Sequence, residues 1–410
     1  MKILFVNHFP LTGSGSGVYT VNLAKSLKKR GNECAIVFPE NRSNYEKIDG
    51  IKLYPVFFKD KEKIDGELKF NFPCFSTHPR STYNFNEMKD SEKIEYQDAF
   101  INKLSEVFEE FEPDIVHAQH LWTLSGISAD FCSNYKIPLI VTCHGTDILG
   151  IREEEKSNNY WGSVFAKKAY DYADNIITIS RDNKKLLSEI YGENDKVEFI
   201  RNGVDTNTFY RDKNIKREEV LEKFNIEKVP EHIISFVGKL TYIKGVDTLL
   251  KALAINNDKN TLTLIAGDGE LRRDLEKLSR DLSLDNVYFL GNLSQDKLNR
   301  IYNISDLAVV PSRSEAFGLV AAEAMTCGTP VIATRVGGLP DFVKEDVGLL
   351  IDSDDSSGLA NSINDILTGN KKFDRDYISK KMKDNYSQDK IIDEVSTIYE
   401  AALDRKVYHK

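Results

Sequence analysis

Residues 307–340 read LAVVPSRSEAFGLVAAEAMTCGTPVIATRVGGLP and hold two short apolar runs on either side of a segment with helical composition. The first run, 307–310, ends at a proline, and the second begins at Val331. Between them, a polar loop leads into an alanine-rich segment that starts near Gly318 and stops at a Cys-Gly pair. A strand, a crossover helix and a second strand form a βαβ unit with parallel strands. This stretch therefore predicts an α/β domain.

The same alternation of β-rich apolar runs and segments of helical period extends along the whole chain. The predicted strands cover residues 3–7, 33–38, 51–56, 115–118, 139–143, 175–180, 197–200, 233–237, 261–266, 287–290, 307–310, 331–333 and 348–350. Each half begins with a strand, a loop containing glycine and an amphipathic helix, at 18–29 and at 245–254. Two such halves predict two Rossmann-like, doubly wound domains that face each other across a cleft.

The pattern breaks at 202–208, NGVDTNT, where glycine, asparagine and aspartate interrupt it. We therefore place an N-terminal domain at 1–203 and a C-terminal domain at 204–387. The last residues, at about 388–410, have helical composition, and we expect this helix to pack back on the N-terminal domain.

Length, charge and cysteine content indicate how many domains the chain has, which partners it binds and where it is located. The chain has 410 residues, more than one hydrophobic core usually organises, and a formal net charge of −9, which argues against nucleic-acid partners. The apolar start, KILFVNHFP, is too short for a signal peptide, and no apolar run is long enough to span a bilayer. The five cysteines lack the close spacing of a metal or redox motif. We therefore expect a cytoplasmic protein without a transmembrane segment, while peripheral membrane contact stays open.

The loop and helix start at 315–320 have the features of an anion site. The first turn of a helix leaves backbone N–H groups without intrahelical acceptors, and the helix dipole is positive at that end. A glycine at position 318 would let a phosphate approach the backbone closely. Glu315 precedes the helix and Glu323 lies within it, so the two carboxylates would bracket a bound diphosphate.

These motifs resemble those of the retaining GT-B glycosyltransferases of family four. EAFGLVAAE, from Glu315 to Glu323, looks like the family's E-x7-E motif, and GKLTYIKG at 238–245 is similar to its G-[RK]-L-x3-K-G segment. RNGVD at 201–205 resembles the interdomain segment, and HGTD at 144–147 resembles the segment that carries the family's histidine. The resemblance covers nearly the whole chain.

The resemblance implies an enzyme that transfers a hexosyl or N-acetylhexosaminyl group from a nucleotide diphosphate sugar to an acceptor. The C-terminal domain would bind the donor and the N-terminal domain the acceptor. Front-face chemistry with retention is implied, without a metal or another cofactor. The implied catalytic residues are His144, Lys239, Lys244 and Glu315. The implied donor-binding residues are Gly15, Gly17, Gly238, Phe317, Gly318, Leu319 and Glu323.

Two patterns could suggest a metal site. His117 and His120 are three residues apart but lack a third convincing ligand. Residues 352–355 contain Asp-x-Asp, yet they follow a late strand in a polar loop, so we interpret them as an exposed helix start.

Several alternatives stay open at this point. A catalytically silent nucleotide-sugar sensor or scaffold would share the fold, and an epimerase or a phosphorylase would share the two-domain shape. Uridine is the expected donor base. GSGV at 15–18 together with HGTD is similar to the L-malate glycosyltransferase of bacillithiol synthesis. Residues 57–92 depart from that pattern, which leaves the acceptor unidentified.

The segment 71–85, NFPCFSTHPRSTYNF, is the candidate acceptor site. Four aromatic residues in it could form a wall: Phe72, Phe75, Tyr83 and Phe85. His78 and Arg80 would then bind an anionic acceptor, since an arginine fork suits a carboxylate or a phosphate. The equally weighted alternative is that the aromatics pack beneath a surface loop and Arg80 is solvated.

Overall fold

The computed structural model describes residues 1–60, 66–75, 78–157, 159–227 and 229–408. The chain divides into two compact units, each described here by itself. Unit 1 comprises Met1–Ile200 and Ile392–Lys410, and unit 2 comprises Arg201–Ile391. The division thus falls three residues before the sequence-based boundary. Parts of the predicted segments, namely 61–65, 76–77 and 409–410, lie outside the described residues.

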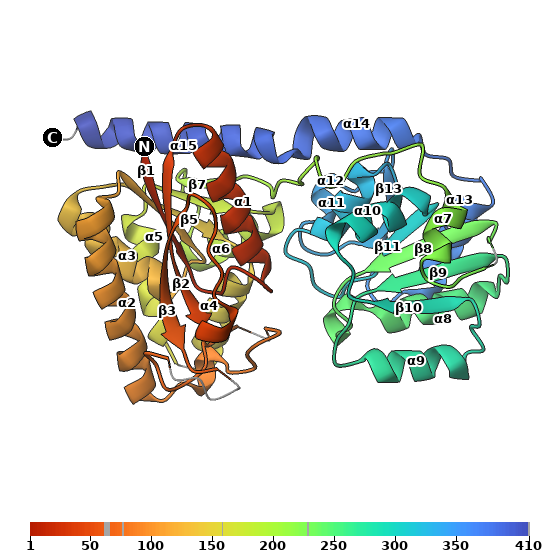
Figure 1. Ribbon diagram of the computed structural model, residues 1–410, viewed down its shortest axis with the longest axis horizontal. Coiled ribbons are helices and arrows are strands. Elements are labelled where there is room, and N and C mark those ends of the chain that lie inside the picture. Colours follow the sequence, from red (N-terminus) through yellow and green to blue (C-terminus); the bar gives the residue numbers. More distant parts are fainter. Residues whose placement is uncertain (61–65, 76–77, 158, 228, 409–410) are drawn as a thin grey trace. The chain divides into compact units, whose positions relative to one another are not determined.

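Unit 1 contains a seven-stranded parallel sheet in the order β3-β2-β1-β4-β5-β6-β7 (Figure 1). Its strands are β1 (Lys2–Asn7), β2 (Glu33–Asn41), β3 (Lys52–Phe58), β4 (Ile115–Gln119), β5 (Leu139–Cys143), β6 (Asn175–Thr178) and β7 (Val197–Phe199). The chain builds the sheet outward from β1 in one direction and then returns to add β4 on the other side. The carboxyl ends of β1 and β4 therefore flank the point where strand order reverses, which is where ligands bind in open α/β sheets.

The helices of unit 1 are α1 (Gly15–Lys29), α2 (Asp90–Phe111), α3 (Thr123–Tyr135), α4 (Thr146–Ser157), α5 (Trp161–Tyr172) and α6 (Arg181–Tyr191), with short 3-10 turns η1 (Arg42–Asn44) and η2 (Phe85–Glu87). Helix α1 begins three residues earlier than predicted. The reason is an N-cap: the Ser14 hydroxyl accepts a hydrogen bond of 3.0 Å from the backbone N–H of Gly17.

The last helix, α15 (Gln388–Tyr408), completes unit 1 with its later turns. The Tyr399 hydroxyl lies 2.6 Å from Nδ1 of His117 in the middle of the sheet, and both side chains are buried. Asp393 pairs with Arg30, the C-cap of α1, at 2.5 Å, and Arg405 bonds to Asn175. These contacts place the C-terminal helix against the N-terminal unit.

Unit 2 contains a six-stranded parallel sheet in the order β10-β9-β8-β11-β12-β13 (Figure 1). Its strands are β8 (His232–Val237), β9 (Thr261–Ala266), β10 (Val287–Gly291), β11 (Leu307–Val310), β12 (Val331–Thr334) and β13 (Gly348–Ile351). Every strand predicted from the sequence is therefore present in the two sheets. The strand order reverses between β8 and β11, as it does between β1 and β4 in unit 1.

The helices of unit 2 are α7 (Arg217–Glu222), α8 (Val246–Asn256), α9 (Arg272–Asp281), α10 (Gln295–Ile304), α11 (Leu319–Thr326), α12 (Leu339–Phe342), α13 (Ser356–Leu367) and α14 (Arg375–Tyr386), with the 3-10 turn η3 (Tyr242–Lys244). The Asp355 side chain accepts a hydrogen bond from Gly358 N and caps α13. The interpretation of 352–355 as a helix start is thereby confirmed.

The segment after β3 contributes side chains to the core of unit 1. Phe72 and Phe85 are buried and belong to the same hydrophobic cluster as the strands. Phe75 and Tyr83 are partly buried against that cluster. The predicted aromatic wall is therefore wrong for Phe72 and Phe85, because rings buried in the hydrophobic core do not line a binding site.

Candidate functional site

The carboxyl ends of β8 and β11 bring together two residues that are 71 positions apart in the sequence. The Nζ atom of Lys244 lies 2.5 Å from Oε2 of Glu315, and the Ser312 hydroxyl donates to the same oxygen at 3.3 Å. The Lys244 side chain is 26% exposed and that of Glu315 is 13% exposed, so solvent still reaches the pair. The motifs predicted both residues, but not that they form an ion pair with each other.

Lys239 and Gly238 follow β8 on the same loop as Lys244. The N–H of Gly238 donates to the carbonyl of Ala266 at 3.0 Å, which ties the end of β8 to β9. Lys239 is exposed at this edge of the sheet. Two lysines therefore follow the carboxyl end of β8, and one of them, Lys244, contacts Glu315.

The start of α11 presents backbone rather than side chains. Gly318 is the N-cap with φ of +97°, and a Cβ atom there would lie 2.4 Å from Cδ2 of Leu339. Packing is thus a second reason for glycine at this position. The Phe317 ring is buried against Phe342, with ring centroids 5.1 Å apart, and Leu319 is 36% exposed. The first N–H groups of α11 lack intrahelical acceptors, so they could bind an anion.

Glu323 lies within α11 and is only 8% exposed. Burial raises the pKa of its carboxyl to about 8, although a hydrogen bond of 3.4 Å from the Tyr302 hydroxyl opposes the shift. At neutral pH this carboxyl is mostly protonated in the free protein. A ligand that donates hydrogen bonds to it would favour the ionised form.

In unit 1, His144 follows β5 and contacts the neighbouring strand β4. Its Nε2–H donates to Oε1 of Gln119 at 2.8 Å. Burial, with a smaller contribution from His8, lowers the pKa of His144 to about 3, so the imidazole is neutral. A neutral ring that donates through Nε2 has Nδ1 as an acceptor, which suits a ligand hydroxyl.

The glycine loop at 13–17 leads into α1. The segment at 78–80 contacts this loop at the carbonyl of Thr12. Gly15 is exposed, and a Cβ atom there would meet nothing within 4 Å, whereas Gly17 is buried in the first helical turn. The His78 Nε2–H donates to the carbonyl of Thr12 at 3.2 Å, and Nδ1 accepts from the backbone N–H of Arg80 at 3.2 Å. Both ring nitrogens of His78 are therefore bonded within unit 1, which leaves neither of them to bind an acceptor in this conformation.

Arg80 is engaged as well. Its Nη1 atom lies 2.5 Å from Oε1 of Glu40 at the end of β2, and Nη2 lies 3.4 Å from the Thr12 carbonyl. The Glu40 side chain is 4% exposed, and burial raises its pKa although Arg80 opposes the shift. Neither a solvated Arg80 nor one that is free to grip an anion describes this geometry.

Replacing Arg80 by methionine is expected to lower the free energy of unfolding by ~2–4 kcal/mol, because Glu40 would be left as an unpaired buried charge. Chemical denaturation measures this loss, and the double variant Glu40→Gln, Arg80→Met should recover at least half of it. Unchanged stability with selective loss of transfer to an anionic acceptor would instead support the acceptor role predicted from the sequence.

The histidines near these strands do not form a metal cluster. Within the ranges that the structure describes, no group of three or more His, Cys, Asp or Glu side chains could hold a metal ion. His117 bonds to Tyr399 and to the Thr142 hydroxyl, and His120 is buried beside His144 with ring centroids 4.8 Å apart. The five cysteines are buried, and none of them is in a disulfide.

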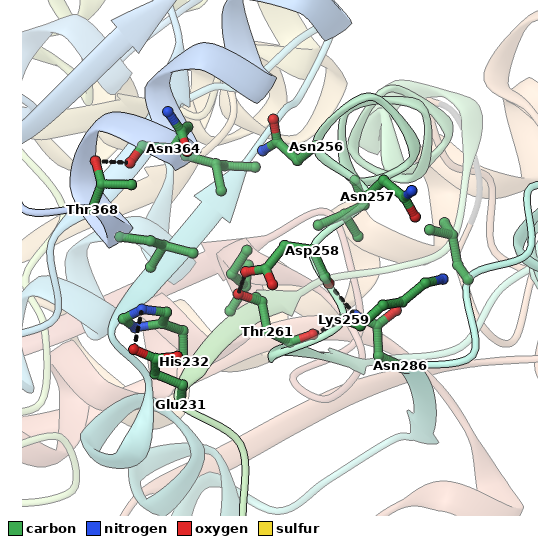
Figure 2. Close-up of a pocket in the computed structure, with 15 residues that line it drawn as sticks. Glu231, His232, Asn256, Asn257, Asp258, Lys259, Thr261, Asn286, Asn364 and Thr368 are labelled. Carbon is green, nitrogen blue, oxygen red and sulfur yellow. Dashed lines mark hydrogen bonds and ion pairs between the residues drawn. The ribbon is translucent and has the colours of Figure 1, made fainter.

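A cavity of about 260 Å³ lies in unit 2 at the amino ends of the sheet strands, away from the carboxyl ends that carry the candidate site (Figure 2). It is lined by the first residues of β8 and β9 and by the ends of α8 and α13. Lys244 and Glu315 follow the other ends of the strands. Its polar side chains partly bond to one another, as Thr261 does to Asp258 at 2.5 Å. This cavity is therefore separate from the site at the carboxyl edge.

Sequence reasoning missed two residues that shape the candidate site, Gln119 and Arg313. Gln119 orients His144, and Arg313 contacts the loop that carries Lys244 through the Tyr242 carbonyl at 2.6 Å. Neither residue is marked by a motif, since an isolated polar residue beside a strand end is common.

In the helices that the structure describes, none is both long and apolar enough to cross a membrane.

Comparison with known proteins identifies similar chains. An uncharacterized glycosyltransferase of Methanocaldococcus jannaschii is 28% identical over 98% of this chain and 99% of that protein. The N-acetyl-alpha-D-glucosaminyl L-malate synthase of Bacillus anthracis is 25% identical over 95% of this chain and 94% of that protein. Sucrose-phosphate synthase from Thermosynechococcus elongatus has a TM-score of 0.77 at 21% identity, covering 98% of both chains. Anabaena HepE in complex with UDP has a TM-score of 0.72 at 18% identity, covering 98% of this chain and all of that one.

Family profiles match both units. The profile described as Glycosyltransferase Family 4 matches residues 13–208, and the profile described as Glycosyl transferases group 1 matches residues 217–384. The two profiles together span most of the chain, and the solved structures share its two parallel-sheet, Rossmann-like units. The chain therefore belongs to the family 4, group 1 glycosyltransferases with the GT-B fold.

Proposed function

We propose that this enzyme transfers a hexose or an N-acetylhexosamine from a UDP-linked donor to an acceptor with retention of anomeric configuration. The observation that carries the proposal is the shared edge of the unit 2 sheet, where Lys239, Lys244, Glu315 and the start of α11 lie together. Two lysines and a helix N-terminus suit a diphosphate, and a carboxylate beside them suits the hydroxyls of a sugar.

Each residue has a role in this proposal. Lys239, Lys244 and the backbone at 317–319 stabilise the negative charge that develops on the leaving diphosphate. Glu315 accepts hydrogen bonds from the donor sugar, and Glu323 accepts them from the ribose hydroxyls. From unit 1, Nδ1 of His144 accepts a hydrogen bond from the sugar, and the exposed backbone at Gly15 contacts the diphosphate, while Gly17 supports this loop from within the first helical turn.

The reaction would proceed on one face of the sugar. The bond between the anomeric carbon and the diphosphate oxygen breaks, the acceptor oxygen bonds to the same face, and the departing phosphate oxygen takes the acceptor proton. No protein nucleophile is required in this scheme. The protein contributes placement and electrostatic stabilisation.

Relatives support the choice of donor. HepE has been solved with UDP and with UDP-glucose, and the Bacillus anthracis relative is named for an N-acetylglucosaminyl group. The acceptor stays unassigned, because His78 and Arg80 are used within unit 1. A cytoplasmic location is part of the proposal, and it is supported by five cysteines that are all reduced thiols.

Incubation of the purified chain with labelled UDP-glucose and UDP-N-acetylglucosamine, each with a panel of acceptors, tests the proposal. Mass spectrometry should detect a glycosylated product together with released UDP, and NMR should show the donor's anomeric configuration in that product. A product of inverted configuration would contradict retention. Binding of the donor with neither UDP release nor product would favour the alternative, a catalytically silent sensor or scaffold.

Transfer is expected to be unchanged in excess EDTA, because lysines and a helix N-terminus neutralise the leaving group. The measurement is the rate of UDP release with and without the chelator. Loss of activity in EDTA that manganese specifically restores would contradict metal-independent chemistry.

A further inference from the structure

Arg313 lies in the loop after β11, two residues before Glu315, and its side chain is only 12% exposed. Its guanidinium reaches three separate elements of unit 2. The Nη1 atom donates to the carbonyl of Tyr242 in η3 at 2.6 Å, and Nη2 lies 2.9 Å from Oδ2 of Asp247 in α8. The Nε atom donates to Oδ1 of Asp354, just before α13, at 2.7 Å.

The contacts with η3 bear on Lys244, which is the last residue of that turn. The backbone N–H of Arg313 donates to the carbonyl of Ile243 at 2.7 Å, and the guanidinium lies 4.1 Å from the centre of the Tyr242 ring. Both residues that precede Lys244 in the turn are therefore held by Arg313.

The residue after Lys244 is held by the same loop. Gly245 has φ of +64°, and a Cβ atom there would lie 2.0 Å from the carbonyl oxygen of Pro311. The backbone on both sides of Lys244 is thus fixed against residues 311–313. Because Glu315 belongs to the same loop, these contacts set where the two charged groups meet.

The carboxylates of Asp247 and Asp354 orient the Arg313 guanidinium. The hydrogen bond that Arg313 donates to Asp247 raises the pKa of its guanidinium, and a second hydrogen bond, to Asp354, adds to the effect. A planar guanidinium can bond to two carboxylates and a carbonyl at once, whereas a lysine ammonium lacks this fixed fork. The geometry therefore depends on arginine rather than on positive charge alone.

We propose that Arg313 is a positioning residue that fixes Lys244 in register with Glu315 for transfer. The inference rests on the proposed function, in which Lys244 stabilises the leaving diphosphate. A catalytic group that is misplaced by ~1 Å can cost ~100-fold in rate. Loss of the Arg313 contacts should therefore lower kcat more than it changes KM.

The test is a double-variant cycle with Arg313→Lys, Lys244→Ala and their combination. Arg313→Lys is expected to lower kcat by ~10–100-fold with the KM for the donor within ~3-fold, and to have little further effect when Lys244 is already alanine. Equal effects in both backgrounds would overturn the proposal, because a merely structural role is independent of Lys244. The matched control is Arg272→Lys, since Arg272 of α9 also pairs with two carboxylates, those of Asp268 and Glu276.

A second measurement needs no substrate and separates this inference from the proposed function. In a crystal structure of the Arg313→Lys variant, Nζ of Lys244 should lie more than 4 Å from Glu315, with the rest of the unit 2 sheet unchanged. A retained pair would overturn the positioning role even if the wild type transfers sugar. If the pair is lost but the wild type transfers no sugar with any donor, the positioning role holds and the proposed function fails.

Discussion

Replacing Glu315 by glutamine is expected to lower sugar transfer by ~10²–10³-fold and, at the same time, to tighten binding of UDP by ~3–10-fold. The loss of transfer follows because a charged acceptor beside the reacting sugar is removed. The gain in affinity follows from the free protein, where Glu315 lies 2.5 Å from Nζ of Lys244. The Glu315 carboxylate competes with the diphosphate for the Lys244 ammonium, and it also repels the diphosphate. Removing the charge of Glu315 therefore favours the binding of UDP, the product.

Isothermal titration with UDP and steady-state transfer assays measure the two effects on the same preparations. Glu276→Gln is the matched control, since Glu276 pairs with Arg272 on the surface of α9 and lies outside the proposed site. Weaker UDP binding by Glu315→Gln would show that the carboxylate supports the diphosphate site and does not compete with the ligand for Lys244.

Replacing Glu323 by glutamine is expected to stabilise the fold at alkaline pH and to weaken donor binding there. Burial raises the pKa of Glu323 from an ordinary 4.5 to about 8, so the folded state binds this proton more tightly than the unfolded chain does. The wild type therefore loses stability as pH rises from about 4.5 to about 8, and the variant does not. Each tenfold difference in proton affinity is worth ~1.4 kcal/mol, so the advantage of Glu323→Gln should grow by ~3–4 kcal/mol between pH 5 and pH 9.

The affinity for the donor should change with pH in the opposite direction to the stability of the wild type. If ribose hydroxyls donate to the ionised Glu323, the affinity of the wild type for UDP-glucose should rise by ~10-fold or more from pH 6.5 to pH 8.5, because the ionised fraction rises. The variant should bind ~1–3 kcal/mol more weakly at the upper pH and show no such dependence. Titration calorimetry at both pH values decides this, and an equal pH dependence in the variant would mean that another group titrates.

The order of strands and helices could be predicted from the sequence for a physical reason. A strand such as β11, with the sequence LAVV, is buried along its whole length, so it appears as an unbroken apolar run between helical segments. The ends of helices were harder to predict than the strands. The start of α1, for example, depends on a hydrogen bond from the backbone N–H of Gly17 to the hydroxyl of Ser14.

The candidate site could be predicted only one residue at a time. Motifs singled out Lys244 and Glu315, but their pairing depends on β8 and β11 lying side by side in the sheet. The sequence predicts a ligand for Arg80 because it does not reveal that Glu40, 40 positions away near the end of β2, pairs with it. Arg313 stands between two serines in a polar loop, and nothing local distinguishes it from a solvated arginine.

The place of α15 also fixes the order in which the two units can mature on the ribosome. Unit 2 is continuous from Arg201 to Ile391, whereas unit 1 needs Ile392, Tyr399 and their neighbours to cover its sheet. At ~5–20 residues per second, synthesis of the intervening chain takes on the order of 10–40 s. Throughout that interval, His117 lacks its tyrosine partner and the first 200 residues remain an incomplete domain. Of the two units, unit 1 is therefore the first to begin synthesis and the last to be finished.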